Sequence, residues 1–190
     1  MEKNSKNFLR NIPNIISGFR ICLVAVFAVM FINGRFMPCL AVYITAFLSD
    51  VLDGYLARRN NWITSVGKLL DPFADKLMLI TALICFTVEG WIPLWVLIVI
   101  AAKELTLCVC GLVLYKQNVV VEADITGKIA TGLWTCGVAS TLLKNLFPQI
   151  ALISSIILVC AVVASLFALI NYAARYVIMP RKTDEQVDKQ

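Results

Sequence analysis

The sequence predicts an all-α membrane protein with six transmembrane helices and both termini in the cytoplasm. Of its 190 residues, 60% are apolar and 15% are charged, whereas a soluble domain averages about 45–50% apolar and about 25% charged residues. This composition excludes a disordered chain, a collagen-like repeat and an ordinary cytosolic enzyme. Two further observations support the prediction: the apolar residues form six segments of membrane-spanning length, and the basic residues are unevenly distributed between the segment ends.

Each apolar segment is close to the ~20 residues that a helix needs to cross a ~30 Å hydrocarbon layer. The predicted helices cover residues 13–33, 37–57, 69–88, 91–115, 127–146 and 149–179. We expect a single domain over residues 1–190. Within it, residues 1–12 form either an interfacial helix on the cytoplasmic face or a frayed end, and residues 180–190 form a cytoplasmic tail.

The basic residues predict the orientation of the chain, because cytoplasmic loops of membrane proteins are enriched in lysine and arginine. If the six segments alternate across the membrane, Arg35 and Lys144 lie on one side and twelve basic residues lie on the side of the termini. The twelve are Lys3, Lys6, Arg10, Arg58, Arg59, Lys68, Lys116, Lys128, Arg175, Arg181, Lys182 and Lys189. Arg20, Lys76 and Lys103 fall inside predicted spans, where a charge is costly and therefore suggests a function.

The absence of histidine limits the chemistry of the chain. Without it there is no histidine base, no Ser-His-Asp triad and no imidazole-ligated metal. The seven cysteines include no CxxC pair, so we interpret them as small buried hydrophobic residues. The net charge of +5 is modest and is explained by topology and anionic lipid, so we expect no nucleic-acid partner.

Four aspartates, Asp50, Asp53, Asp71 and Asp75, lie in or beside the second and third apolar segments. A carboxylate at the edge of hydrocarbon costs several kcal/mol unless it is paired, hydrated or bound to metal. Neighbouring carboxylates also raise each other's pKa, so a bare cluster would be largely protonated. Divalent cations would keep the cluster ionised, and the sequence therefore predicts a metal site.

The spacing of the aspartates supports this prediction. Asp50 and Asp53 are three residues apart and Asp71 and Asp75 are four apart, so each pair shares one helix face. The connection between the helices returns the chain to the same side, so both pairs can meet near the cytoplasmic surface. Carboxylate-only ligation favours Mg²⁺, Mn²⁺ or Ca²⁺. Because Mg²⁺ usually joins protein carboxylates to substrate phosphates, we expect a diphosphate-bearing substrate.

The residues between the aspartates are suited to a phosphate ligand. Gly54, Gly67 and Ala57 have small side chains or none, which leaves room for a ligand to approach the helix backbone. Arg58 offers a planar guanidinium to a phosphate. The complete string resembles the signature of the CDP-alcohol phosphatidyltransferase family at every fixed position. It reads Asp50-x2-Asp53-Gly54-x2-Ala57-Arg58-x8-Gly67-x3-Asp71-x3-Asp75.

The resemblance implies a role for each signature residue. Asp50, Asp53, Asp71 and Asp75 would hold metal, and Asp75 would also act as the general base on the acceptor hydroxyl. The residues implied to bind the CDP diphosphate are Asp50, Asp53, Gly54, Ala57, Arg58, Gly67 and Asp71.

The implied reaction is attack of a hydroxyl on the β-phosphorus of CDP-diacylglycerol with release of CMP. Two divalent ions, Mg²⁺ or Mn²⁺, would neutralise charge on the leaving oxygen. Because the chain has no histidine, a carboxylate is a reasonable base. One substrate is a lipid and the other is dissolved in water, so we expect the active site at the cytoplasmic surface of the inner cell membrane.

Three basic elements outside the signature are candidates for the acceptor site. Arg20 ends the string that starts at Asn11, Lys103 precedes Glu104, and Lys128 and Thr131 belong to a G-K-x-x-T element. These elements resemble the N-x-P-N-x-x-[ST]-x-x-R, R-E and G-K-x-x-T elements of phosphatidylglycerophosphate synthases within this family, with a lysine in place of the usual arginine of the R-E pair. The resemblance implies glycerol 3-phosphate as acceptor, whose two negative charges suit converging basic residues.

Other interpretations remain open at this point. Cardiolipin synthases of the same family share similar N-terminal and [GS]-K-x-x-T elements, and their acceptor is phosphatidylglycerol. In a different functional class, the aspartates would form the ion site of a divalent cation transporter. The basic residues could also serve local pairing or snorkelling, with Lys103 beside Glu104 and Lys76 beside Asp75.

Two small residues in the last predicted helix bear on assembly. Ala164 and Ala168 form a small-xxx-small pair, which permits either close helix packing within the chain or a homodimer. The expected partners are therefore CDP-diacylglycerol, glycerol 3-phosphate, the lipid bilayer and a second copy of the chain.

Overall fold

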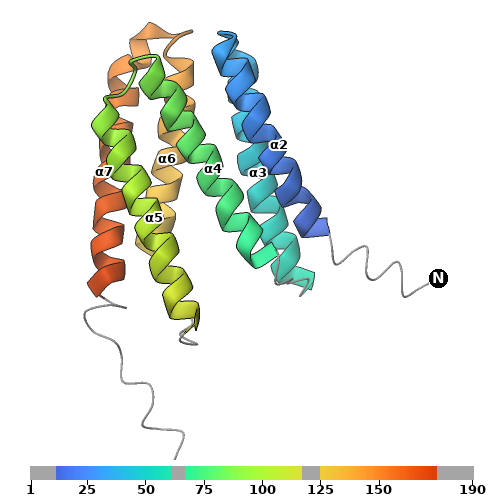
Figure 1. Ribbon diagram of the computed structural model, residues 1–190. Helices are drawn as coiled ribbons and strands as arrows, with labels where there is room; N and C mark the ends of the chain where they lie inside the picture. The colour runs from blue at the N-terminus through green and yellow to red at the C-terminus, as the bar shows by residue number, and fades with distance from the viewer. Residues whose placement is uncertain (1–11, 61–66, 117–124, 175–190) are drawn as a thin grey trace, which may run out of the picture.

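A computed structural model shows that the chain folds as a helix bundle (Figure 1). The structure describes residues 12–60, 67–116 and 125–174. At some positions within these ranges it describes the backbone alone, namely 12–15, 17, 53–60, 67–72, 112 and 114–116. The helices of this part of the chain are α2 (Ile12–Ile32), α3 (Phe36–Asn60), α4 (Gly67–Val88), α5 (Leu94–Lys116), α6 (Ile125–Leu143), the 3₁₀ helix η1 (Pro148–Ile150) and α7 (Ala151–Ala173).

The all-helical class is confirmed for the described residues, which contain no strand. Each of the six predicted segments corresponds to one long helix, with ends that differ by a few residues. The predicted fifth helix ends early, at Leu143, because the chain turns there before η1. The end of the sixth segment, residues 175–179, lies outside the described residues, as do residues 1–11 of the predicted interfacial helix and the tail at 180–190.

Only part of the predicted membrane pattern is found in the hydropathy of the described helices. Two of them contain stretches long and apolar enough to cross a membrane: Leu94–Gly111, with a mean hydropathy of 2.0, and Pro148–Ala173, with 2.8. The apolar stretches Gly18–Ile32 and Phe36–Leu52 are shorter. The other long helices contain charged residues, such as Arg20 in α2, Asp50 in α3 and Lys76 in α4, which lower their hydropathy. Six spans and the membrane side of the termini therefore stay predictions.

Successive long helices run in alternating directions through the bundle (Figure 1). As a result, α2 begins and α7 ends at the same end of the bundle, which is the lower end in Figure 1. Helix α3 ends and α4 begins at this lower end as well. Helix α2 packs against both α3 and α4, α6 packs along α7, and α3 contacts α6. This arrangement brings the two aspartate-bearing helix ends to one end of the molecule, as the spacing predicted.

The turns at the upper end have a defined geometry. The turn after α2 contains Gly34 with φ +69°, and the turn after α4 contains Gly90 with φ +70°. Glycine adopts this left-handed conformation without a Cβ clash. In both turns the glycine N–H and the next N–H donate back into the last helical turn, as for Gly34 to Phe31 (2.9 Å) and Arg35 to Met30 (3.0 Å). These bonds satisfy the free carbonyls of each helix end and fix the reversal of the chain.

An aromatic cluster fills the bundle beneath these turns. Phe31 is 3% exposed, and its ring centroid lies 5.8 Å from that of Phe86 and 5.2 Å from that of Trp91. Phe27 and Phe36 extend the cluster on either side. Aromatic pairs at these separations add stabilisation beyond the area that they bury. The apolar core therefore occupies the upper half of the bundle.

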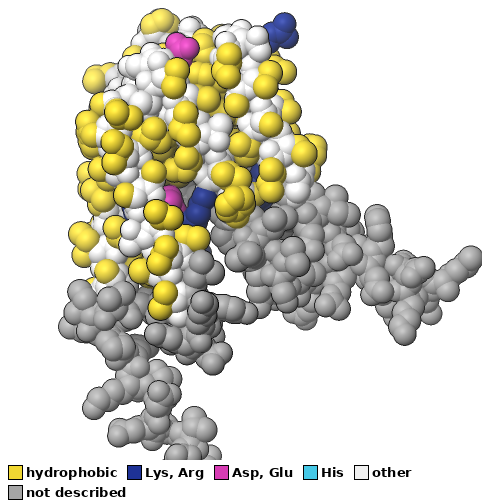
Figure 2. Space-filling model, in the orientation of Figure 1, with side chains coloured by type: hydrophobic (Ala, Val, Ile, Leu, Met, Phe, Trp, Pro, Cys, Tyr) yellow, Lys and Arg dark blue, Asp and Glu magenta, His cyan; other side chains and the backbone are white. Residues whose placement is uncertain are grey.

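The outer surface of the bundle is apolar. Hydrophobic side chains cover much of the described face in Figure 2, and few charged groups interrupt them. On α7, large side chains such as Leu152, Val159 and Ile170 are more than half exposed. Apolar patches larger than a few hundred Å² are unusual on soluble monomers and mark a membrane or protein contact.

Helices α6 and α7 pack closely around Gly137 and two buried hydroxyl groups. A Cβ atom at Gly137 would lie 2.9 Å from Cδ2 of Leu158. One turn further along α6, the hydroxyl oxygens of Thr141 and Ser154 lie 2.9 Å apart and are shielded from solvent. The hydrogen bond satisfies both groups within the apolar interface.

Enlarging Gly137 should therefore separate α6 from α7. We expect Gly137→Leu to lower the free energy of unfolding by about 1–3 kcal/mol, the usual cost of overpacking. Adding Leu158→Ala should restore part of the loss. Thermal unfolding of the detergent-purified protein measures the effect. Gly111→Leu is the matched control, because a Cβ atom at Gly111 meets nothing within 4 Å. Equal losses for both leucine variants would contradict the prediction.

Candidate functional site

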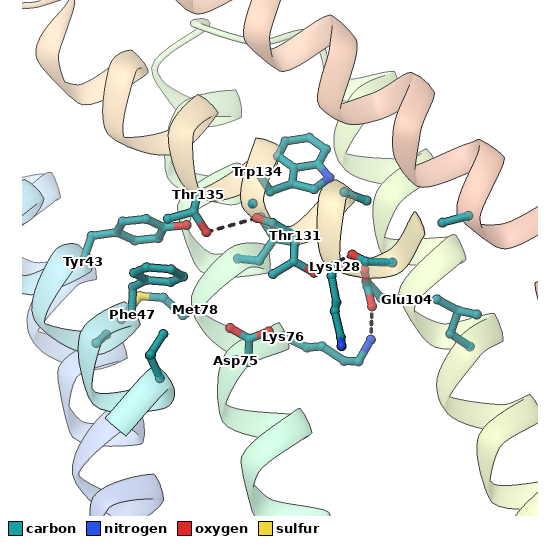
Figure 3. Close-up of a pocket in the computed structure, with 18 of the residues that line it drawn as sticks. Tyr43, Phe47, Asp75, Lys76, Met78, Glu104, Lys128, Thr131, Trp134 and Thr135 are labelled. Carbon is teal, nitrogen blue, oxygen red and sulfur yellow. Dashed lines mark hydrogen bonds and ion pairs between the residues drawn. The ribbon is translucent and has the colours of Figure 1, made fainter. Parts of the chain in front are cut away.

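A pocket of about 600 Å³ lies in the lower half of the bundle, where its lining includes Arg20, Asp75 and Lys128 from the first halves of α2, α4 and α6. Every long helix from α2 to α7 contributes to its lining. The lining includes large apolar side chains, among them Phe47, Met78 and Leu107. It also carries charged and hydroxyl groups, which Figure 3 shows converging from α4, α5 and α6. The pocket can therefore accommodate a ligand that has both a polar and an apolar part.

The first charged contact at this site joins α2 to α3. The Arg20 side chain is 1% exposed, and its Nη1 lies 2.7 Å from Oδ1 of Asp50, whose side chain is 39% exposed. A guanidinium buried in this way needs a carboxylate partner, because an uncompensated charge in an apolar interior is costly. Two residues that the sequence analysis assigned to different functions are thus in direct contact.

Asp75 is exposed to the pocket from α4 (Figure 3). Its carboxylate interacts electrostatically with those of Asp50 and Glu104 and with the positive charges of Arg20 and Lys76. Asp50 of α3 and Asp75 of α4 therefore share one electrostatic environment. Asp75 lies between basic groups and the open pocket, a position from which a carboxylate can accept a proton from a bound hydroxyl.

The positions of the remaining signature residues are given by the backbone alone. Asp53 lies one turn beyond Asp50 on α3, and Asp71 lies one turn before Asp75 on α4. Gly54, Ala57 and Arg58 follow on α3, and Gly67 is the first residue of α4. The side chains of Asp53, Ala57, Arg58 and Asp71 lie outside the part of the chain whose side chains are described, so their predicted contacts stay predictions.

The residues of this region are compatible with divalent cations. All four predicted ligands are carboxylates, which prefer hard ions such as Mg²⁺ and Mn²⁺. Asp50 and Asp75 are the two whose side chains are described, and their negative charges are near enough to repel each other. Such proximity is favourable when cations lie between or beside the carboxylates.

The structure brings the four predicted acceptor residues into this one pocket. Arg20, Lys103, Lys128 and Thr131 all line it, although they come from three helices. Lys128 and Thr131 are exposed to the cavity on the first turns of α6. The Thr131 hydroxyl donates to the carbonyl oxygen of Gly127 at 3.1 Å, so it presents lone pairs rather than a proton to a ligand.

Lys76 and Lys103 both form ion pairs with Glu104, and only the pair with Lys103 was considered from the sequence. Lys103 Nζ lies 2.5 Å from Oε1 of Glu104, in accordance with the local pairing considered for it. Lys76 bonds to Oε2 of Glu104 on the neighbouring helix, in addition to interacting with the adjacent Asp75 (Figure 3). The sequence contains no sign of this bond, because Lys76 and Glu104 are 28 residues apart.

Two aromatic residues were also missed as parts of the site. Tyr43 and Trp134 are buried and line the pocket on α3 and α6 (Figure 3). The indole Nε1 of Trp134 donates to Oγ of Ser165 on α7 at 2.7 Å, which fixes the orientation of the ring. In the sequence these residues are indistinguishable from ordinary core aromatics, because their apolar neighbours carry no signal of a cavity. Ala168 of the small-residue pair also faces this pocket.

A profile of the CDP-alcohol phosphatidyltransferases matches residues 10–170 of the chain, which include the six helices up to the last turn of α7. The chain belongs to the CDP-alcohol phosphatidyltransferase family. The identification from the aspartate signature is thereby confirmed.

Three relatives illustrate the similarity within the family. The CDP-diacylglycerol–glycerol-3-phosphate 3-phosphatidyltransferase of Bacillus subtilis (strain 168) is 35% identical over 151 residues, 72% of this chain and 78% of the relative. The protein of the same name from Aquifex aeolicus (strain VF5) is 25% identical over 170 residues, 87% of this chain and 95% of the relative. The CMP-forming cardiolipin synthase of Streptomyces coelicolor is 36% identical over 127 residues, 63% of this chain and 59% of the relative.

The contact between Arg20 and Asp50 yields a prediction that does not depend on the activity. Arg20→Met removes the cation that contacts Asp50 and leaves the carboxylates of α3 and α4 to repel each other. Because Asp50 is partly exposed, we expect a loss below the range for fully buried pairs, about 2 kcal/mol of unfolding free energy.

The double variant Arg20→Met/Asp50→Asn should recover much of this loss, because it removes both charges. Thermal unfolding of the three proteins in one detergent measures the difference. If the double variant is less stable than Arg20→Met, charge balance is not the reason for the contact.

Proposed function

We propose that the protein transfers the phosphatidyl group of CDP-diacylglycerol to glycerol 3-phosphate, forming phosphatidylglycerophosphate and releasing CMP. One observation carries the proposal: a single pocket collects Asp75 of the signature together with Arg20, Lys103 and Lys128. The names of the Bacillus and Aquifex relatives, which state this activity for those proteins, support it.

On the donor side, the signature aspartates would hold two Mg²⁺ or Mn²⁺ ions and, with them, the CDP diphosphate. Asp50 and Asp75 contribute from neighbouring helices, and Asp53 and Asp71 would complete the set from the adjacent turns. When bound, the ions supply charge neutralisation at the diphosphate. Arg58, with Gly54, Ala57 and Gly67, would line the nucleotide side of the site.

On the acceptor side, the pocket supplies both a base and positive charge. Asp75 would take the proton of the attacking hydroxyl, which raises the nucleophilicity of its oxygen toward the β-phosphorus. Arg20, Lys103 and Lys128 would hold the acceptor phosphate and orient the hydroxyl toward Asp75. The basic residues outnumber the acidic ones in the described lining, where Lys76 and Glu104 are also present. A dianionic acceptor fits this balance of charge.

The proposed setting is a bilayer. The six long helices would span the inner cell membrane with both chain ends in the cytoplasm, which agrees with the shared position of the start of α2 and the end of α7 (Figure 1). The apolar outer surface would contact lipid, and the lower end of the bundle would meet the cytoplasm (Figure 2). The pocket would then receive a lipid-linked donor and a water-soluble acceptor from opposite directions.

Cardiolipin synthesis is the second candidate function. The Streptomyces relative carries that name, and the pocket lining includes large apolar side chains such as Phe47 and Leu107. Phosphatidylglycerol would then replace glycerol 3-phosphate as the anionic acceptor, and the reaction at the β-phosphorus would be unchanged.

An acceptor panel tests the assignment. We expect the purified protein to release CMP when it is given CDP-diacylglycerol, glycerol 3-phosphate and Mg²⁺ or Mn²⁺. Chelation with EDTA should abolish CMP release, and either ion in excess should restore it. Phosphatidylglycerol, serine and inositol phosphate serve as competing acceptors. CMP release with phosphatidylglycerol alone would favour the second candidate, and ion flux in liposomes without CMP release would indicate a transporter.

Substitution of Asp75 tests the proposed base. Asp75→Asn keeps the size of the side chain but cannot accept the proton, so we expect turnover to fall at least about a hundredfold. Binding of CDP-diacylglycerol, measured at equilibrium with labelled lipid, should largely survive. Glu89→Gln is the control, because Glu89 is an exposed acidic residue at the opposite end of the bundle. Near-normal turnover of Asp75→Asn would show that Asp75 is not the base.

A further inference from the structure

The Glu104 carboxylate joins two lysines from different helices. Its Oε1 accepts a hydrogen bond from Lys103, the preceding residue on α5, and its Oε2 accepts one from Lys76 on α4. Each carboxylate oxygen therefore holds a different ammonium group, and Figure 3 shows the bond to Lys76. We refer to Lys76, Glu104 and Lys103 as the Lys-Glu-Lys bridge.

The bridge carries a net positive charge in a restricted environment. The exposed fractions are 9% for Lys103, 12% for Glu104 and 33% for Lys76. Within the bridge, one carboxylate faces two ammonium groups. The Asp75 carboxylate also interacts with Lys76, but Lys128 adds a further ammonium group, so the pocket lining keeps an excess of positive charge. Each ammonium group has three N–H donors and uses one of them on Glu104. An anion that enters the pocket would meet both the excess charge and further donors.

The bridge lies where it could bind the acceptor, and not at the surface where a purely structural ion pair would be expected. All three of its residues line the pocket, and Lys76 directly follows Asp75 on α4. The ammonium ends of Lys76 and Lys128 point into the same part of the cavity (Figure 3). A phosphate held there would lie close to the carboxylate that is proposed to accept the hydroxyl proton.

We propose that Glu104 is a positioning residue, which fixes Lys76 and Lys103 at a spacing that binds the phosphate of the acceptor. The inference rests on the proposed function and adds Lys76 to the residues that contact the acceptor. Lysine side chains have four rotatable bonds, and a fixed partner reduces the entropy that each would lose when it binds a phosphate. Glu104 thus contributes to acceptor affinity although its own charge repels the acceptor.

A positioning role and simple charge compensation predict opposite changes in anion binding when Glu104 is neutralised. If Glu104 only balances charge, its neutralisation makes the pocket more positive and should strengthen the binding of an anion. If it positions the lysines, neutralisation frees them and weakens binding despite the more favourable net charge. Shortening the side chain separates the two roles further, because aspartate keeps the charge but does not reach both ammonium groups.

Steady-state kinetics of the full-length purified protein test the inference. For Glu104→Gln and for Glu104→Asp, we expect the KM for glycerol 3-phosphate to rise about tenfold, while the KM for CDP-diacylglycerol changes less than about threefold. Lys76→Gln should raise the same KM, because one ammonium group is lost. Glu89→Gln, remote from the pocket, is the control and should match the wild type. Thermal unfolding identifies any variant that fails to fold, and the other two variants then provide the test.

The outcomes separate this inference from the function on which it rests. No CMP release by the wild-type protein with glycerol 3-phosphate would refute the proposed function, and the inference with it. An active wild type with an unchanged or lower acceptor KM in Glu104→Gln would refute the inference alone. An equal rise of both KM values in every Glu104 variant would assign Glu104 a general structural role instead.

Discussion

The structure depends on the pairing of charges between helices that are otherwise apolar. Arg20 of α2 contacts Asp50 of α3, and Lys76 of α4 contacts Glu104 of α5. An isolated charge inside such a bundle would be too costly to retain, so each pair constrains how its two helices are rotated and shifted against each other. The same contacts gather the polar groups at one cavity, so that the fold and the site have a common cause.

The two halves of the bundle have different roles. Above the pocket, tight glycine turns and tilted or edge-on aromatic rings around Phe31 hold the helices together, and Lys144 lies over the ring of Trp91. Below that level a cavity opens, and charged and hydroxyl groups join the aromatic rings of Tyr43 and Trp134 in its lining. A rigid apolar half can offset the unfavourable desolvation of a polar half, and this division lets a helix bundle of modest size carry a site rich in ionisable groups.

Hydropathy and spacing predicted most of the fold and part of the site. The lengths of the apolar segments predicted six helices, because helix formation in apolar segments depends mainly on local sequence. The three- and four-residue intervals predict that the aspartates of each pair share a helix face, which stays a prediction for Asp53 and Asp71, whereas Asp50 and Asp75 of the two helices do interact electrostatically. The bonds from Lys76 to Glu104 and from Trp134 to Ser165 were not predictable, because they depend on how helices far apart in the chain are rotated in the bundle.

The distribution of the pocket lining over all six long helices has a consequence for biosynthesis. Ala168 lies near the end of α7, and Lys128 and Trp134 lie on α6, so a nascent chain that stops after α5 lacks an entire wall of the cavity. Partly made or truncated chains would therefore carry the aspartate signature without enclosing a substrate. Competence for chemistry would arise in one step, when the final helix joins its predecessors.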